Sequence, residues 1–93
     1  MEVRYHPKVL SEDLPSITKT NRLRIKNAIE KKLHTHPETF GEPLRGSLIP
    51  IWKLRVGDYR IVYGFEDLKI YIHAIGHRKQ IYTRIASNRE RIE

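Results

Sequence analysis

The sequence predicts an α+β fold in which two N-terminal helices pack on one face of a mainly antiparallel sheet. Two observations predict it. Apolar residues recur at helical spacing before residue 35, and from Ile51 onward the period changes to two. The length of 93 residues fits one domain, which we place at residues 1–93. The expected order of elements is β-α-α-β-β-β-α, with an N-terminal strand and a three-stranded antiparallel meander.

The first half of the chain is expected to contain a strand at residues 2–6 and then helices. The strongest helix is predicted from about residue 20 to 35, with Asn21 or Thr20 as its N-cap. Pro37 marks the latest point at which it can end. The apolar side of this helix carries Ile25, Ala28, Ile29 and Leu33.

The second half is predicted to be rich in strands. Residues 36–50 are expected to form a loop, because prolines and glycines interrupt any regular pattern. Strands follow at residues 51–56, 59–65 and 68–76, which are rich in β-branched and aromatic residues. Gly57-Asp58 suits a two-residue hairpin turn, and Glu66-Asp67 separates the second pair. A short basic helix is expected from about Ile81.

The hairpin turn fixes which side chains share a face of the sheet. If Gly57-Asp58 is the turn, Val56 lies opposite Tyr59 and Arg55 lies opposite Arg60. The core face then carries Trp52, Leu54, Val56, Tyr59, Ile61, Tyr63, Ile70, Ile72 and Ala74. The opposite face carries Lys53, Arg55, Arg60, Tyr71, His73, Ile75 and His77, with His73 beside Arg60, and Arg78 follows where the last strand ends.

This cationic face is the main functional signal in the sequence. The chain has a net charge of +7, which favours polyanionic partners such as nucleic acid. Like charges directly opposite each other on a ladder destabilise the sheet by up to about 1 kcal/mol. We therefore interpret the cluster as an anion site, most naturally for the phosphates of a nucleic acid. The alternative interpretation is an exposed face whose long side chains extend into water.

The sequence gives little support for a cysteine-based, metal or cofactor site, or for a location in a membrane. The absence of cysteine excludes disulfides, thiolate metal sites and a cysteine nucleophile. His34 and His36 close a helix beside two lysines that would repel a cation, so no metal site is expected. No nucleotide-binding glycine pattern is present, and no cofactor is expected. Without an apolar run of about 20 residues or a signal peptide, we expect a cytoplasmic protein with no membrane partner.

The same residues suit RNA cleavage without a metal. Attack of a ribose 2′-OH on the adjacent phosphate needs in-line placement, a proton acceptor, stabilisation of charge and a proton for the leaving oxygen. Arginines and a lysine on a rigid sheet supply the charge stabilisation. The candidates for proton transfer are His77, His73, Tyr82 and Lys53, although an ordinary Tyr or Lys has a pKa of about 10.

Three segments carry a family resemblance: Pro43-Leu44-Arg45-Gly46, then residues 52–63 (WKLRVGDYRIVY), then residues 75–82 (IGHRKQIY). Together they resemble the RelE group of the RelE/ParE toxin superfamily over nearly the whole chain. The resemblance implies a toxin that enters the ribosomal A site and cuts mRNA, leaving a 2′,3′-cyclic phosphate. It also implies a cognate antitoxin that wraps the toxin and represses their shared operon, so that operator DNA is contacted only through the antitoxin.

The resemblance also implies site residues. It assigns the catalytic set to Lys53, Arg60, Arg78 and Tyr82, and contacts with RNA to Arg45 and Arg55, and we add His73 and His77 as RNA-binding candidates from the sheet register. Some family members have a second lysine where this chain has Ile51, and another basic residue where it has His77. His77 is thus a candidate to compensate for Ile51 in proton transfer.

Two other functions stay open at this point. A ParE-like inhibitor of DNA gyrase shares the fold but typically lacks the Lys/Arg/Tyr set. A non-catalytic nucleic-acid or protein-binding module on the same scaffold predicts salt-dependent binding and no cleavage. Outside a catalytic role, Arg60 and Arg78 would form surface ion pairs, and Tyr82 would pack its ring on a helix.

Overall fold

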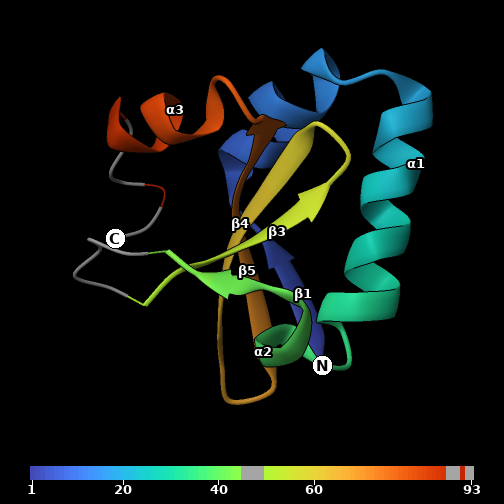
Figure 1. Cartoon of the computed structure of the whole chain (residues 1–93), viewed down its shortest axis with the longest axis vertical. Helices are drawn as coiled ribbons and strands as arrows, with labels where there is room; N and C mark the ends of the chain where they lie inside the picture. Colours follow the sequence, from blue (N-terminus) through green and yellow to red (C-terminus); the bar gives the residue numbers. More distant parts are fainter. Residues whose placement is uncertain (45–49, 88–90, 92–93) are drawn as a thin grey trace.

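The antiparallel meander is present as predicted in the computed structural model, which describes residues 1–44, 50–87 and 91 (Figure 1). Its strands are β3 (Trp52–Val56), β4 (Tyr59–Glu66) and β5 (Lys69–His77). The predicted turn and register of the first hairpin are confirmed, with Val56 opposite Tyr59 and Arg55 opposite Arg60. Gly57 has a φ of 60°, which the tight turn requires and which glycine adopts without steric cost.

Two further strands complete a five-stranded sheet of order β1-β5-β4-β3-β2. Strand β1 (Glu2–Tyr5) runs parallel to β5 at one edge, and β2 (Glu42–Pro43) pairs antiparallel with β3 at the other. The segment expected to be a plain loop therefore contains β2 and a short helix, α2 (Pro37–Phe40). Neither element was predicted, because two to four residues are too few to show a period.

The N-terminal helices cover one face of this sheet. They comprise two short turns, η1 (Val9–Asp13) and η2 (Leu14–Ser16), and a long helix formed by α1 (Lys19–Ala28) and η3 (Ile29–Leu33). The predicted N-cap at Asn21 or Thr20 is wrong, because the helix begins earlier and the Thr18 hydroxyl accepts a hydrogen bond from the Asn21 backbone N–H. The predicted apolar side of the helix is buried against the sheet, where the main core contains Ile25, Ile29, Leu33, Leu54, Ile61, Tyr63, Ile70, Ile72 and Ile75.

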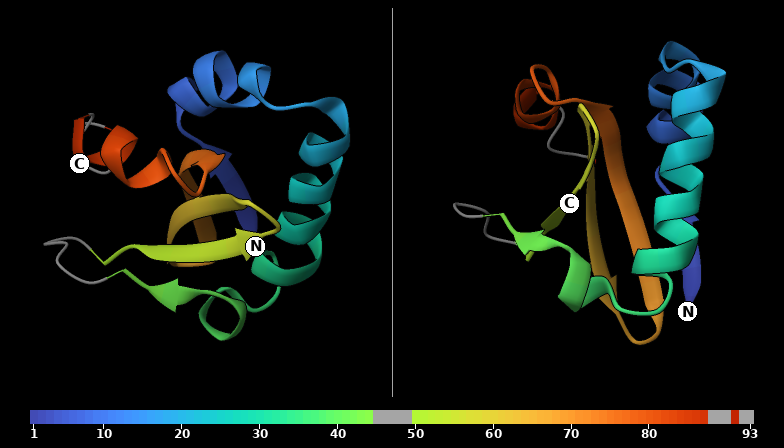
Figure 2. Two further views of the ribbon diagram at one scale, coloured as in Figure 1. Left: turned by 45° about the horizontal axis from the view of Figure 1, so that its top comes forward. Right: turned by 45° about the vertical axis from the view of Figure 1, so that its right-hand side comes forward.

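The C-terminal helix α3 (Ile81–Ser87) lies on the opposite face of the sheet from α1 (Figure 2). Its buried residues Ile81 and Ile85 form a second apolar cluster with Ile51, Val62 and Ala74. The expectation that helices share one face thus holds for the N-terminal helices, whereas α3 adds a third layer. Because α3 covers only part of this face, the strands beside it stay accessible.

A β-bulge changes the predicted faces of β5. Val62 pairs with Ala74, but the next residue, Tyr63, pairs with Ile72, so that His73 is an extra residue in β5. One extra residue reverses the alternation of side chains beyond it. The predictions for Ala74 and Ile75 are therefore wrong: Ala74 lies under α3, and Ile75 lies in the main core. The bulge has no signature in composition, which is why the alternation did not predict it.

The second turn also differs slightly from the prediction. Glu66 pairs with Lys69, so the turn residues are Asp67 and Leu68, both with positive φ. Among the described residues, no helix has the length and apolar character needed to cross a bilayer.

Candidate active site

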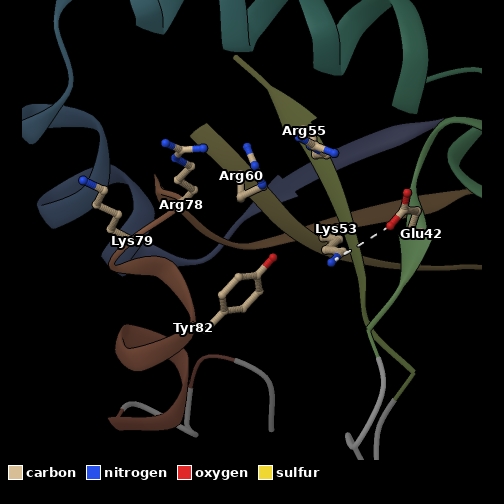
Figure 3. Close-up of a pocket in the computed structure, with 7 residues that line it drawn as sticks. All are labelled: Glu42, Lys53, Arg55, Arg60, Arg78, Lys79 and Tyr82. Atoms are coloured by element: carbon tan, nitrogen blue, oxygen red, sulfur yellow. Dashed lines mark ion pairs between the residues drawn. The ribbon is translucent and has the colours of Figure 1, made fainter. Parts of the chain in front are cut away.

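One pocket of about 510 Å³ lies on the sheet face beside α3 (Figure 3). Five cationic side chains, one carboxylate and one phenol line it: Lys53, Arg55, Arg60, Arg78, Lys79, Glu42 and Tyr82. The predicted catalytic set of Lys53, Arg60, Arg78 and Tyr82 is thus brought together in a single pocket. Arg55, predicted to contact RNA, lines it as well.

Arg60 is held by the hairpin turn beside it. Its Nη1 donates to the carbonyl oxygens of Gly57 at 3.0 Å and Tyr59 at 2.9 Å. The residue is only 8% exposed, yet it lines the pocket. Its cross-strand partner on β5 is Gly76, which brings no side chain between the guanidinium and the pocket. Arg60 is therefore a fixed positive charge in the wall of the pocket.

Arg78 is placed by the end of β5. Its backbone N–H donates to the Asp58 carbonyl oxygen at 2.8 Å, which ties the end of β5 to the hairpin turn. Its Nε lies 3.9 Å from the Asp58 carboxylate, at a site where both side chains are more than half exposed. An exposed pair of this kind contributes little to stability, so the guanidinium is available to an anion at little energetic cost.

Tyr82 enters the pocket from α3. Its ring extends toward the strands, and Lys53 Nζ lies 5.7 Å from the ring centroid (Figure 3). This distance allows a cation–π attraction between the two residues. The phenol is 39% exposed, so that it is open to a ligand in the pocket.

Sequence reasoning missed two lining residues, Glu42 and Lys79. Glu42 pairs with Lys53 across the β2–β3 ladder, which places its side chain on the same face. Its carboxylate lies 4.0 Å from Lys53 Nζ. In the sequence, Glu42 directly precedes Pro43, the first residue of the segments that carry the family resemblance. A strand of only two residues at this position was not predicted. Lys79 follows Arg78 directly, and only the fold shows that both side chains line one pocket.

The two predicted histidines do not line the pocket. The prediction that His73 lies beside Arg60 is wrong, because the bulge at His73 places Gly76 there. The same reversal puts His77 opposite Tyr59, with their ring centroids 5.9 Å apart in an edge-to-face arrangement. Burial lowers the pKa of His73 below its ordinary value. Arg45, the remaining candidate for RNA contact, lies outside the described residues.

His34 and His36 are both exposed. Within residues 1–44, 50–87 and 91, no three His, Cys, Asp or Glu residues are grouped to hold a metal ion.

This arrangement is chemically suited to a phosphodiester. Cationic side chains from β3, from β4 and from the turn after β5 line one volume, where they are able to stabilise negative charge that develops on phosphorus oxygens. A carboxylate on β2 and a phenol on α3 approach the same volume from different sides (Figure 3). Such groups are able to accept and donate protons during a displacement at phosphorus.

Comparison with known proteins agrees with the fold and the motifs. Residues 3–82 match the family described as ParE toxin of type II toxin-antitoxin system, parDE. A chain in the crystal structure of the toxin–antitoxin complex RelBE2 from Mycobacterium tuberculosis has a TM-score of 0.75 and 25% identity, covering 83% of this chain and 96% of that chain. A chain in the archaeal RelE–RelB complex from Pyrococcus horikoshii OT3 has a TM-score of 0.58 and 26% identity, covering 83% of this chain and 93% of that chain.

Comparison with curated protein sequences gave no match. The match to the family model spans most of the chain, and the resemblance to the RelE/ParE superfamily is confirmed. The chain therefore belongs to the ParE toxin family of type II toxin–antitoxin systems.

Proposed function

We propose that this toxin is a metal-independent endoribonuclease that cuts mRNA in the ribosomal A site. The observation that carries the proposal is the convergence of five cationic side chains, one carboxylate and one phenol on a single pocket. The cations would supply the charge stabilisation that a metal ion supplies in other nucleases. The pocket also contains the Lys/Arg/Tyr set by which this chain resembles the RelE group.

The proposed reaction is an in-line attack of the ribose 2′-oxygen on the adjacent phosphorus. A bond forms between the 2′-oxygen and phosphorus, and the bond from phosphorus to the 5′-oxygen breaks. Glu42 takes the 2′-OH proton, and Tyr82 donates a proton to the leaving 5′-oxygen. Lys53, Arg60 and Arg78 hold the phosphate and stabilise its added negative charge. The products are a 2′,3′-cyclic phosphate and a 5′-OH end.

The decisive experiment is cleavage of a reporter mRNA in a translating extract, mapped by primer extension. The wild-type toxin should produce fragments that end at the A-site codon. Arg78→Gln/Tyr82→Phe should reduce the cleavage rate by at least about 10²-fold, since both side chains face the reacting phosphate. Lys31→Gln/Lys32→Gln removes positive charge from the helical layer and should leave cleavage intact. Absence of fragments with wild-type toxin, or equal cleavage by the pocket variant, would refute the proposal.

A second candidate function is inhibition of DNA gyrase. It is favoured by the family match itself, which is to the ParE toxin. The two functions differ in the product that accumulates in cells expressing the toxin. Gyrase inhibition predicts DNA breaks and loss of supercoiling by purified gyrase with intact mRNA, whereas the proposed nuclease predicts RNA fragments and unaffected gyrase. RNA binding that weakens steeply with salt, with neither product, would indicate a non-catalytic binding module.

The toxin is proposed to bind a cognate antitoxin. The two solved structures described above are toxin–antitoxin complexes. The excess of cationic side chains in the pocket suits an acidic segment that covers it and prevents access of RNA. Addition of the purified antitoxin should abolish cleavage at a stoichiometric ratio. In the cell, the same protein would connect the toxin to operator DNA.

A further inference from the structure

A completely buried carboxylate lies at the base of α3. Asp13, the last residue of η1, is 0% exposed. It accepts hydrogen bonds from the Ile75 backbone N–H at 2.9 Å, from Arg84 Nη1 at 2.9 Å, and from Arg91 Nη1 at 2.7 Å and Nη2 at 3.1 Å. A buried carboxylate is tolerated only when charged partners and hydrogen bonds replace its water. Asp13 meets this condition through residues that lie 62 to 78 positions away in the sequence.

These contacts fix α3 relative to β5. Arg84 belongs to α3, and its Nη1 also donates to the Ile75 carbonyl oxygen at 3.2 Å. Asp13, Arg84 and the two peptide groups of Ile75 thus form a closed set of hydrogen bonds. A helix of only seven residues has no stability of its own in water, so its position depends on such tertiary contacts.

The approach of α3 to the sheet is close at Gly76. A β-carbon at this position would lie 3.2 Å from Arg84 Nη1 and 3.2 Å from the Ile81 side chain. The helix therefore rests so close to β5 that a β-carbon at Gly76 would be tightly packed against both side chains. Gly76 is also the cross-strand partner of Arg60, so the contact lies beside the pocket.

The geometry of the helix connects this contact to the pocket. Ile81, Arg84 and Ile85 lie three and four positions apart and form the side of α3 that faces the sheet. Tyr82 is about 100° around the helix from Ile81, where its ring reaches the pocket above Lys53. Rotation or sliding of α3 on the sheet would therefore move the Tyr82 hydroxyl out of reach of a bound phosphate.

We propose that Asp13 is a positioning residue for Tyr82: it holds α3 through Arg84 and thereby sets the phenol over the pocket. Asp13 does not line the pocket and acts only through the helix. The effect on cleavage rests on the proposed nuclease function. The effect of Asp13 on the position of α3 does not depend on the nuclease function.

The test is Asp13→Asn in the full chain, with Glu12→Gln as the matched control. Glu12 is the neighbouring carboxylate, with a side chain 57% exposed, and it forms an ion pair with Arg91 rather than with a residue of α3. Hydrogen exchange measured on the 81–87 segment should become about tenfold faster in Asp13→Asn, with exchange unchanged in β4 and in β5 apart from the Ile75 amide, which donates to Asp13 itself. The control should stay within about twofold of wild type. Unchanged exchange in Asp13→Asn would overturn the proposal, whether or not the chain cleaves RNA.

Cleavage kinetics then test the role of Tyr82. Asp13→Asn should lower kcat by about as much as Tyr82→Phe and leave KM nearly unchanged, because the cations that bind RNA stay in place. The double variant Asp13→Asn/Tyr82→Phe should cleave no more slowly than the slower single variant. Losses that multiply in the double variant would show that Asp13 does not act through Tyr82.

If circular dichroism shows that Asp13→Asn is unfolded, Arg84→Met takes its place. This variant removes the link to α3 and leaves Asp13 paired with Arg91. The same faster exchange at residues 81–87 and the same non-additivity with Tyr82→Phe are expected. Wild-type exchange, or losses that multiply, would overturn the proposal for this variant as well.

Discussion

Arg55 and Arg60 lie directly opposite one another on the β3–β4 ladder. Arg60 is held by carbonyl oxygens of the turn, and Arg55 is exposed with no ion pair to any residue that the structure describes. Two like charges at paired positions destabilise a sheet by up to about 1 kcal/mol. Under the proposed function, an anionic ligand in the adjoining pocket offsets this repulsion.

Arg55→Thr should therefore stabilise the protein and weaken RNA binding. We expect the free energy of unfolding to rise by up to about 1 kcal/mol, since the repulsion is removed and threonine suits a strand. Urea unfolding followed by the fluorescence of Trp52, the single tryptophan, measures this change. Arg4→Thr, on exposed edge strand β1, is the control for RNA binding and should leave the RNA affinity unchanged. A destabilised Arg55→Thr, or unchanged RNA affinity, would contradict the argument.

Glu42→Gln tests the proposed proton acceptor. The amide has the shape of the carboxylate but does not take up a proton, so the rate of single-turnover cleavage should fall by about 10²- to 10⁴-fold. RNA affinity should stay the same or increase, because a negative charge leaves a cationic pocket. Glu38→Gln in α2 removes an exposed carboxylate four residues away and should behave as wild type. A Glu42→Gln toxin that cleaves at the wild-type rate would exclude Glu42 as the base.

Gly41 fixes the position of Glu42 through Tyr63. The buried Tyr63 hydroxyl donates to the Pro37 carbonyl oxygen at 2.6 Å, and a β-carbon at Gly41 would overlap that hydroxyl. Gly41→Ala should displace β2 and reduce both stability and cleavage, whereas Tyr63→Phe should cost only about 1 kcal/mol for the lost hydrogen bond. The double variant Gly41→Ala/Tyr63→Phe should recover part of the loss, because the hydroxyl is the nearer of the two Tyr63 atoms that the added β-carbon would overlap. Thermal unfolding and cleavage of the three variants check this, and absence of recovery would place the clash elsewhere.

The sequence predicted the β3–β4 hairpin more accurately than the β4–β5 hairpin. The Gly57-Asp58 turn determines both its own geometry and the register of β3 and β4, so the positions of Lys53, Arg55 and Arg60 followed from local chemistry. The faces of β5 depend on a bulge at His73, which shifts the β4–β5 register between Val62 and Tyr63. The sequence therefore predicted the cationic side of the pocket but misplaced His73 and His77.

The parts of the site that were missed have a common cause. Glu42 reaches the pocket through a two-residue strand, and Asp13 reaches α3 through a contact with residues more than 60 positions away. Neither element has a period, and a buried carboxylate in a short helical turn looks like any surface acid in the sequence. Such long-range pairings are set by tertiary structure, whereas helix faces and hairpin registers are set by residues close in the chain.

RNA binding should depend on salt in proportion to the phosphates that the pocket contacts. For single-stranded RNA, each neutralised phosphate contributes a slope of about −0.7 to the plot of log affinity against log salt concentration. Lys79→Gln removes one lining cation that lies outside the proposed catalytic steps, so this slope should become shallower by about 0.7. Lys26→Gln in α1 is the control and should keep the wild-type slope. An unchanged slope for Lys79→Gln would remove Lys79 from the RNA-binding surface.

His73 should make the stability of the toxin depend on pH below neutrality. Burial is the main cause that lowers the pKa of His73 below 6.5, and the nearby His6 lowers it further. The unfolded chain then binds a proton that the folded chain does not, so the free energy of unfolding falls as the pH drops from above about 6.5 toward the folded pKa. Urea unfolding at about pH 7.5 and about pH 5.5 should show a smaller loss for His73→Gln than for wild type. His34→Gln, an exposed control, should lose as much stability as wild type, and an equal loss in His73→Gln would show that His73 does not cause it.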